Sequence, residues 1–414
     1  MHPAPVAWHV THWGTDQWSR GSWTSLGVGG STTDRATAGT PVDDRFVLAG
    51  DATNPVAPSM THGAYDEGVR AARWAIDGGA RRIAVIGAVF AGLGAARTAI
   101  DLGAEVVVLE ARDRIGGRAH TVALGRDVHA DAGAAWLQQG PTNSLARLAD
   151  QWGLRSVPTD FHRPLAAAAD GPVGDVAAAH AALAAHLAIA PADATVADVL
   201  PAYLAALTPS QRRDAQHAVD LELELENPAP PHLLAARTAL EEPGVGVGDR
   251  WLPGGYTALQ QRLANGVDIR LGTPVRGVTW HADGVEVRTA SGEIHRADRC
   301  ICTIPVWLAP ELTLTPGLPA AQLAAIQRLV PGVVEKVVLR FDERWWPVSP
   351  SGYLRWYDHP ASWGEWLDLT DGVGAPVVAG LIAGTAVSRH HHGDDEATAL
   401  AATAALARWA TSIT

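Results

Sequence analysis

Residues 85–94 read Val-Ile-Gly-Ala-Val-Phe-Ala-Gly-Leu-Gly, and this stretch decides the fold. It ends an apolar run over 82–87, which is typical of a buried strand, and leads into a helical pattern over 91–102. Residues 105–110 predict a further strand. Two parallel strands joined by a helix form a βαβ unit, so we predict an α/β protein with a doubly wound, Rossmann-like sheet.

The turn between the first strand and the helix predicts a bound adenine dinucleotide. Gly87 and Gly92 bring the helix N-terminus against a pyrophosphate, with Ala91 in its first turn. Glu110 ends the next strand, where a carboxylate accepts hydrogen bonds from a ribose. Val89 replaces the second glycine of the usual motif, at the point where a missing side chain lets the backbone approach the phosphates. A strand-turn-helix without a ligand is the alternative.

The next segment, residues 111–121, reads Ala-Arg-Asp-Arg-Ile-Gly-Gly-Arg-Ala-His-Thr. Its paired glycines, Gly116 and Gly117, permit a tight backbone path. Arg112 and Arg118 supply guanidinium donors for phosphates. Because this segment directly follows the dinucleotide turn, the two together favour a dinucleotide-binding protein over the unliganded alternative.

Composition limits the class of protein. A chain of 414 residues exceeds what one hydrophobic core usually supports, so we expect two domains. The net charge of -12 and the lack of a basic cluster argue against a nucleic-acid partner. No stretch approaches the ~18 apolar residues of a membrane span, and the first residues do not resemble a leader. We predict a cytoplasmic protein with a small-molecule partner and no membrane partner, and a homodimer stays open.

Two rare residue types stand out. Cys300 and Cys302 lie two apart on an expected strand, where they are poorly placed to bridge each other and are predicted to be buried free thiols. Lys336 is the only lysine among 32 basic residues. A bias toward arginine explains the other cations but not this exception, so Lys336 is a candidate functional residue, with a structural cation as the alternative.

These motifs resemble the flavin-containing amine oxidase family, which includes monoamine oxidases, polyamine oxidases and flavin-dependent histone lysine demethylases. Residues 83–154 resemble the N-terminal FAD region of the family, and residues 250–305 resemble its middle. Residues 333–347 resemble the segment whose lysine faces flavin N5 through a water. The C-terminal block of the family lies instead at the start of this chain, over 20–68. This order predicts a circular permutation, with 77–82 as the new linker.

The resemblance implies two domains. An FAD-binding domain, Rossmann-like and of the GR2 type, is expected to comprise residues 38–150 and 240–308. An α+β substrate-binding domain is expected to comprise residues 1–37, 151–239 and 309–414. Both follow in the permuted order.

The resemblance also assigns residues to the cofactor. The expected FAD-binding residues are Gly50, Asp51, Thr61, Ala64, Gly87, Val89, Ala91, Gly92, Glu110, Arg112, Gly117, Arg118, Gly133, Ala134, Ala135, Trp136 and Val275. Ser22 stands where some monoamine oxidases carry the cysteine that bonds to FAD, so noncovalent FAD is expected.

Lys336, Trp23 and Met60 are the expected catalytic residues. The resemblance implies that Lys336 assists reoxidation of the flavin by O2. Trp23 takes the place of an aromatic wall beside the substrate, and Met60 replaces the opposite wall, often Tyr; a core tryptophan is the alternative for Trp23. Gln138 is an expected substrate contact, as is Trp23. Because polyamine oxidases tend to carry a glutamate at position 138, a monoamine or an amino acid is favoured.

The implied reaction transfers a hydride from a carbon next to nitrogen to FAD, followed by reduction of O2 to hydrogen peroxide. No metal is expected. The alternatives are an L-amino-acid oxidase or a C-C desaturating flavoenzyme of the same fold. A non-catalytic protein that binds FAD weakly is a further alternative, which Val89 keeps open.

Overall fold

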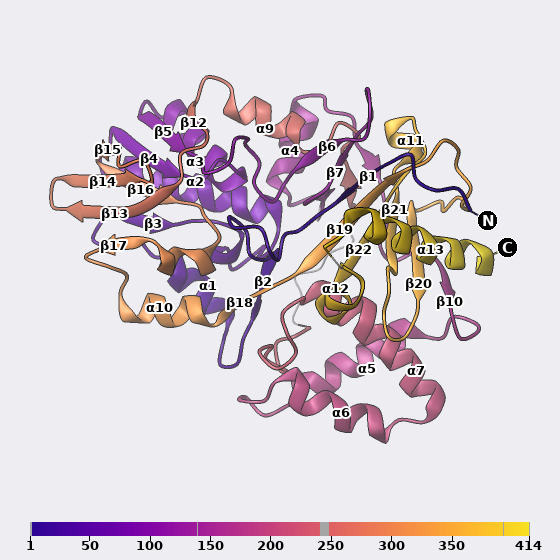
Figure 1. Cartoon of the computed structure of the whole chain (residues 1–414). Coiled ribbons are helices and arrows are strands. Elements are labelled where there is room, and N and C mark those ends of the chain that lie inside the picture. The colour runs from indigo at the N-terminus through magenta and orange to yellow at the C-terminus, as the bar shows by residue number, and fades with distance from the viewer. Residues whose placement is uncertain (1, 139, 241–247, 392, 414) are drawn as a thin grey trace.

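Two large sheets, each with its own core, organise the computed structural model of the chain (Figure 1). The structure describes residues 2–138, 140–240, 248–391 and 393–413. Residues 241–247, which belong to the expected FAD-binding range, lie outside the described residues.

A five-stranded sheet forms the first layer. Its order is β12 (Asp268–Arg270), β5 (Glu105–Leu109), β4 (Arg82–Ile86), β16 (Arg299–Cys302) and β3 (Phe46–Leu48). All neighbouring strands are parallel, and helix α3 (Phe90–Asp101) joins β4 to β5. The predicted βαβ unit is therefore confirmed.

Alternation along these strands makes a three-layer arrangement. Ile83 and Val85 point toward α2 (Thr61–Asp77) and α3. Ala84 and Ile86 point the other way, toward the antiparallel strands β15 (Ile294–Ala297), β14 (Gly284–Thr289), β13 (Val275–His281) and the parallel strand β17 (Thr313–Thr315). Cys300 and Cys302 share this second face as buried free thiols, as predicted.

A six-stranded sheet forms the core of the other half. Its order is β1 (Ala7–Val10), β19 (Val334–Arg340), β22 (Val377–Ala383), β21 (Glu365–Asp368), β20 (Tyr353–Tyr357) and β10 (Leu165–Ala168). Helix α13 (Asp395–Ile413) covers one face, where Trp409 is fully buried against residues such as Val337 and Leu339. Because side chains alternate, Lys336 and Val338 point to the opposite face.

The remaining elements are short. They are strands β2 (Trp23–Leu26), β6 (Thr121–Ala123), β7 (His129–Asp131), β8 (Trp136–Leu137), β9 (Val157–Pro158), β11 (Arg250–Trp251) and β18 (Leu329–Gly332), and helices α1 (Thr32–Ala38), α4 (Ser144–Gln151), α9 (Thr257–Ala264), α10 (Ala320–Gln327), α11 (Thr370–Val373) and α12 (Gly384–His390), with 3₁₀ turns at Asp51–Thr53 and Val306–Glu311.

Helices α5 (Val176–Ala188), α6 (Val196–Ala206) and α7 (Pro209–Ala218) form a separate lobe at the bottom of Figure 1. A π-helical turn, Val219–Leu223, and α8 (Glu224–Glu226) continue from α7 back toward the large sheets. The Ala- and Leu-rich pattern of residues 165–240 predicts helices with a break at Pro201, and this prediction is wrong at two places. Residues 165–168 are strand β10 rather than helix, because the edge of β20 offers backbone partners that outweigh the helix propensity of alanine. Pro201 lies inside α6 rather than breaking it, since the carbonyl it leaves without a donor is that of the exposed Ala197.

The strands of the two sheets come from the two sets of ranges expected for the two domains. All five parallel strands lie within 38–150 and 240–308, and all six strands of the other sheet lie within the remaining ranges. The boundaries themselves stay a prediction. Among the described residues, no helix combines the length and apolarity that a membrane crossing needs, and no cluster of metal-ligating side chains is found.

Candidate cofactor and substrate site

Two adjoining cavities lie along the inner edges of both sheets. One, of about 230 Å³, lies at the carboxyl ends of β4 and β5, beside the dinucleotide turn. The other, of about 300 Å³, reaches the face of the six-stranded sheet that carries Lys336. Asp51, Ala64, Val89 and Arg118 line both cavities, so the two adjoin along these four residues.

The dinucleotide turn has the expected shape. Gly87 adopts a φ of +100°, which favours glycine, and its N–H donates to the carbonyl oxygen of Leu109 at 2.9 Å. A Cβ on Gly92 would lie 1.9 Å from the carbonyl oxygen of Gly87. Of the predicted cofactor residues, all of which are described, Gly92 alone lines neither cavity. Its glycine lets α3 pack directly on the turn.

Glu110 joins the turn to the following segment. Its buried carboxylate accepts hydrogen bonds from the backbone N–H groups of Ala88, at 2.7 Å, and Arg112, at 2.9 Å. It also lines the smaller cavity. Each carboxylate oxygen can accept a further hydrogen bond, so the predicted contact to a ribose remains compatible with this geometry.

Both arginines predicted as phosphate donors contact carboxylates. Arg112 makes a two-pronged ion pair with Asp16, at 2.6 and 2.8 Å. Arg118 pairs with Asp51 at 2.6 Å, and its guanidinium lies 5.2 Å from the ring of Trp307. Because both arginines line the smaller cavity, a phosphate there would compete with these acids for the same donors.

Val89 lines both cavities and packs against Gly117. Its Cγ2 lies 2.4 Å from the position that a Cβ on Gly117 would take, and Gly117 has a φ of +48°. The isopropyl group of Val89 therefore fits only because residue 117 has no side chain. The valine that replaces the second glycine of the motif is thus accommodated by a glycine in the following segment.

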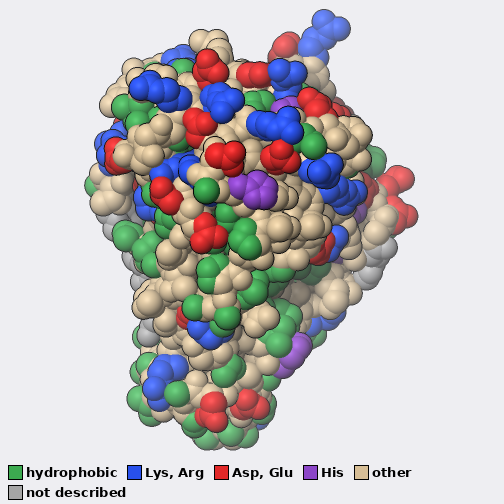
Figure 2. Space-filling view, turned by 90° about the vertical axis from the view of Figure 1, so that its left-hand side faces the viewer, with side chains coloured by type: hydrophobic (Ala, Val, Ile, Leu, Met, Phe, Trp, Pro, Cys, Tyr) green, Lys and Arg blue, Asp and Glu red, His purple; other side chains and the backbone are tan. Residues whose placement is uncertain are grey.

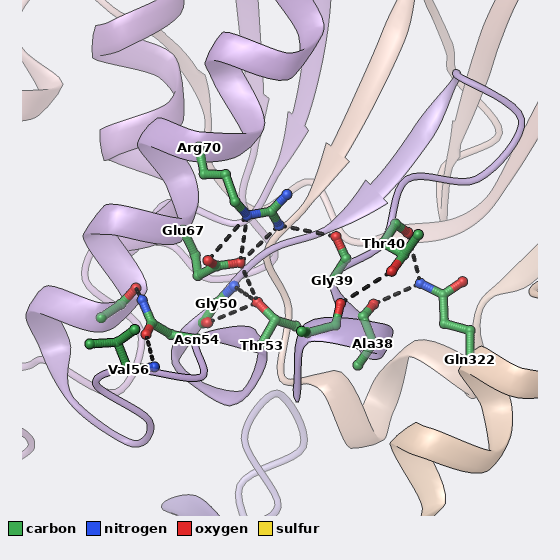
Figure 3. A network of polar contacts seen from close by, with 12 residues as sticks. Ala38, Gly39, Thr40, Gly50, Thr53, Asn54, Val56, Glu67, Arg70 and Gln322 are labelled. Carbon is green, nitrogen blue, oxygen red and sulfur yellow. Dashed lines mark hydrogen bonds and ion pairs between the residues drawn. The ribbon is translucent and has the colours of Figure 1, made fainter. Parts of the chain in front are cut away.

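A network of hydrogen bonds and an ion pair links the Gly50-Asp51 turn to helix α2 (Figure 3). The hydroxyl of Thr53 accepts from the N–H of Gly50 at 3.0 Å and donates to the carboxylate of Glu67 at 2.9 Å. Glu67 in turn pairs with Arg70 at 2.8 Å. Asn54 donates to the carbonyl of Gly63. These contacts lock the turn that presents Asp51 to both cavities, and motif reading did not identify them.

Together these features fit FAD. The smaller cavity has the glycine turn, a carboxylate for the ribose and two guanidinium groups near the phosphate position. A Cβ on Gly50, which lines it, would meet nothing within 4 Å. Val275 lines the smaller cavity but not the larger one. The larger cavity brings Thr61 together with the predicted backbone segment of Gly133, Ala134, Ala135 and Trp136.

Lys336 lies at the larger cavity with its ammonium nearly enclosed. Its Nζ donates to the carbonyl oxygens of Gly133 at 2.5 Å and Asp131 at 3.2 Å, and lies 5.0 Å from the ring of Trp136. Burial lowers the pKa of Lys336 to about 8, against the opposing charge of Asp131. Burial also raises the pKa of Asp131 to about 6. The described part of the chain offers Nζ no third acceptor.

Aromatic side chains form walls of the larger cavity. The predicted residues Trp23, Met60 and Gln138 line it. Sequence reasoning missed Phe161 and Tyr353, which line it as well. The ring of Tyr353 stacks 6.1 Å from Trp136 and meets Phe161 edge-on at 4.8 Å. Neither residue belongs to a recognisable motif, so only the tertiary structure could identify them.

Carboxylates in the same cavity were also missed. Glu226, Asp249 and Glu365 line it. Glu365 is 1% exposed; its Oε2 accepts from Arg355 at 2.8 Å, and its Oε1 has no hydrogen-bond partner among the described residues. Burial raises the pKa of Glu365 to about 7, and Arg355 opposes that shift. Its strand reads Glu-Trp-Leu-Asp, with a carboxylate at each end, so no local signal in the sequence singles out Glu365.

Strand register explains how Lys336 and Glu365 come to share a cavity. Lys336 pairs directly with Leu381, Leu381 pairs with Glu365, and Glu365 pairs with Arg355. Directly opposite residues point to the same face, so the four side chains form one row across β19, β22, β21 and β20. Because neighbouring strands lie about 4.8 Å apart, the Lys336 and Glu365 backbones are about 10 Å apart.

Comparison with known proteins identifies relatives of this arrangement. The family profile described as flavin containing amine oxidoreductase matches residues 1–76, 90–243 and 214–412. Polyamine oxidase 4 of Oryza sativa subsp. japonica is 30% identical over 342 residues, which cover 73% of this chain and 67% of that protein.

Two further similar proteins differ in the share of their length that the match covers. Lysine-specific histone demethylase 1 homolog 3 of the same plant is 28% identical over 336 residues, and the match spans only 41% of its length. The structure of putrescine oxidase bound to putrescine superposes with a TM-score of 0.64 at 21% identity, covering 80% of this chain and 81% of that one. That likeness concerns the fold.

Proposed function

Because this chain belongs to the flavin-containing amine oxidoreductase family, we propose that it oxidises a small amine, with FAD as cofactor and O2 as electron acceptor. The observation that carries the proposal is that the cavity at the dinucleotide turn adjoins the cavity around Lys336, with four lining residues in common. When bound, FAD supplies the hydride acceptor, which O2 reoxidises with release of hydrogen peroxide. The hydroxyl of Ser22 is engaged with the backbone of Val334, in keeping with noncovalent FAD.

The substrate we propose is an amine with a second cationic group. Gln138 on its own favours a monoamine or an amino acid, but Glu226, Asp249 and Glu365 put three carboxylates at the cavity. Asp51 is already paired with Arg118. A diamine would place one nitrogen near the aromatic walls and the other near Glu365, whose free oxygen suits an ammonium. The names of the relatives, polyamine oxidase and putrescine oxidase, agree with this choice.

The residues of the cavity have separable roles in this proposal. Trp23, Phe161 and Tyr353 offer flat faces that hold a cation and exclude water. Lys336 holds a proton at Nζ whose pKa of about 8 lets it gain or lose that proton near neutral pH. Its place beside Trp136 makes it our candidate for assisting the reaction with O2.

We also propose the circularly permuted order and the two domains with their expected boundaries. Strand β3 completes the parallel sheet beside β16, although 250 residues lie between Leu48 and Arg299 in the chain. Strand β1 joins the other sheet, where it packs against α13. The first 77 residues thus contribute to both halves, as expected of a displaced C-terminal block that the short linker 77–82 joins to the rest of the chain.

Purification and a substrate panel test the proposed function. The purified protein should be yellow, with an absorbance band near ~450 nm that comes from the cofactor. Diamines, matched monoamines and amino acids should then be compared for peroxide release in a peroxidase-coupled assay. Diamines should give the highest kcat/KM, and the Lys336→Met protein serves as the matched control with slow reoxidation.

Other outcomes would contradict the proposal in distinct ways. Faster turnover of an amino acid would favour an amino-acid oxidase. Reduction of the bound flavin with formation of a C=C product would favour a desaturating enzyme. A colourless protein that does not take up added FAD would favour a non-catalytic binding protein.

A further inference from the structure

Tyr256 is fully buried and lines neither cavity, yet it contacts three segments that do. It follows the Arg250–Trp251 strand β11 through a Pro-Gly-Gly turn and immediately precedes α9. Its ring meets Phe90, at the start of α3, edge-on at 5.0 Å. The proposed function gives this residue no role.

The polar atoms of Tyr256 form hydrogen bonds with both ends of the segment 131–136. The backbone N–H of Tyr256 donates to the carboxylate of Asp131, at 3.1 and 3.2 Å to its two oxygens. The hydroxyl donates to the carbonyl oxygen of Trp136 at 2.6 Å. The hydroxyl also lies 2.9 Å from that of Thr61, in the first turn of α2.

The same segment holds Lys336. Between the two points that Tyr256 grips, the carbonyl groups of Asp131 and Gly133 accept hydrogen bonds from Nζ, and the ring of Trp136 lies beside it. Asp131 is the charged group that acts on Lys336 directly, and Asp51, Arg118 and Glu365 line the same cavity. The position of the ammonium therefore depends on the path of this segment.

Tyrosine suits this position for a physical reason. A phenol can donate one hydrogen bond and accept another while its ring fills apolar space, so it satisfies the Trp136 carbonyl and meets Thr61 without an orphaned polar atom. Burial raises the pKa of Tyr256 well above its usual value, which keeps the hydroxyl protonated and able to donate. Phenylalanine would fill the same space and leave the partly buried carbonyl of Trp136 without this donor.

We propose that Tyr256 is a positioning residue that clamps the segment 131–136 and so fixes the ammonium of Lys336 and the ring of Trp136 at the cavity. Its kinetic consequence rests on the proposed function, whereas its effect on Lys336 does not. Without the hydroxyl, the Trp136 end of the segment loosens and water reaches Nζ more easily.

The test uses Tyr256→Phe in the FAD-bound protein and a readout specific to Lys336. Because Lys336 is the only lysine, acetylation by acetic anhydride, followed by mass spectrometry across pH 7–11, reports the titration and accessibility of that one ε-amine. We expect the labelling midpoint to rise toward the ordinary lysine value by about half a pH unit or more, because hydration favours the charged form. Reoxidation by O2 should slow while KM for the amine changes little.

Two controls separate positioning from a general loss of stability. Tyr203→Phe removes a hydroxyl from the helical lobe and should leave the midpoint unchanged. Leu183→Ala opens the buried core of that lobe and should lower Tm without moving the midpoint. Thr61→Val removes one hydroxyl partner of Tyr256 and should give a smaller shift of the same sign, which keeps the test decisive if Tyr256→Phe folds poorly.

A wild-type midpoint in both Tyr256→Phe and Thr61→Val would overturn the clamp, whatever happens to turnover. A protein that shows the labelling shift but oxidises no amine would leave the clamp standing and contradict the proposed function instead. If Leu183→Ala instead moved the midpoint as far as Tyr256→Phe does, Tyr256 would be reduced to a structural residue.

Discussion

The ammonium of Lys336 is buried where its charge costs free energy of folding. Burial lowers its pKa from 10.5 to about 8, so between these values the unfolded chain binds more protons than the folded one. Stability therefore rises with pH through this window as the folded protein loses its buried charge first. Below pH 8 the full cost is present.

Lys336→Met should reveal this cost as a pH-dependent difference in stability. We expect the free energy of unfolding of the wild type to rise by up to about 3 kcal/mol relative to the variant between pH 8 and 10.5, since one pKa unit corresponds to about 1.4 kcal/mol. Urea unfolding of both proteins at intervals across this range measures it, and titrating groups that do not interact with Lys336 cancel in the difference. If the free energies of unfolding of the two proteins changed in parallel with pH, the lysine would be shown to titrate normally.

Glu365→Gln should separate the two nitrogens of a diamine. We expect KM for the diamine to rise about tenfold, the size of one lost charge-assisted hydrogen bond, while kcat/KM for a matched monoamine stays within about twofold. In the wild type, KM for the diamine should rise as pH falls through about 7, because Glu365 then becomes protonated.

Glu222→Gln is the matched control for that variant. Glu222 also pairs with Arg355 but does not line the cavity, so its loss perturbs the guanidinium without removing a substrate contact. Equal losses with diamine and monoamine in Glu365→Gln would assign Glu365 to the support of the sheet instead.

For single residues, the sequence predicted those that belong to motifs and missed those that do not. Lys336, Trp23 and Gln138 were predicted and do line the larger cavity. Phe161, Tyr353 and Glu365 were missed because their places depend on how two sheets pack and on strand register, which no local spacing encodes. The ion pairs of Arg112 and Arg118 with acids were missed for the same reason.

Among the elements, the start of α3 holds the most informative departure from its motif. Val89 is the N-cap of this helix, and its side chain occupies the space that the absent Cβ of Gly117 leaves. Val89 and Ala91 at the helix start line the smaller cavity, so the side chain of Val89 stands where a phosphate would approach the backbone.

Val89→Gly should tighten the binding of FAD, and Gly117→Ala should weaken it. We expect the Kd to fall about fivefold in the first variant, because the backbone can then approach the phosphates, and to rise in the second, where a Cβ would meet Val89 at 2.4 Å. Titration of apoprotein into FAD, followed by flavin fluorescence, measures both. In the double variant the effects should be non-additive, since glycine at 89 relieves the clash. An unchanged Kd in Val89→Gly would mean that the valine does not obstruct the cofactor.

Secondary structure was predictable where periodicity is strong and failed where tertiary contacts override it. The βαβ unit and the Asp283-Gly284 hairpin between β13 and β14 follow from apolar patterns and turn residues. Strand β10 has the composition of a helix, and only its pairing with β20 makes it a strand. The row that joins Lys336 to Arg355 across four strands likewise exists only in the assembled sheet.

At the scale of the whole molecule, the chain runs between its halves more often than two consecutive domains would require. Residues 7–10 lie in one sheet, residues 46–48 in the other, and α13 returns to pack against β1. Long-range contacts, not local blocks, therefore hold the N-terminal residues in place.

Arginine and acidic side chains are interspersed over the upper part of the face in Figure 2 rather than gathered by sign.

A rearranged chain tests whether these contacts depend on the order of the segments. We expect residues 79–414, followed by a flexible linker and residues 1–77, to fold, to bind FAD with a Kd within about threefold of the original, and to keep its Tm within a few degrees, because the linker closes a surface connection at a modest entropic cost of about (3/2)RT ln n. A Kd and Tm close to those of the original chain require that β3 still pair with β16, and α2 still pack against α3, when residues 1–77 follow residue 414. A second rearrangement, opened between Ala71 and Ala72 in the buried face of α2, should not fold, which shows that tolerance is confined to the 77–82 connection. Failure of the first rearrangement with intact expression would mean that residues 1–77 must be made first, and would remove the physical basis for treating them as a displaced C-terminal block.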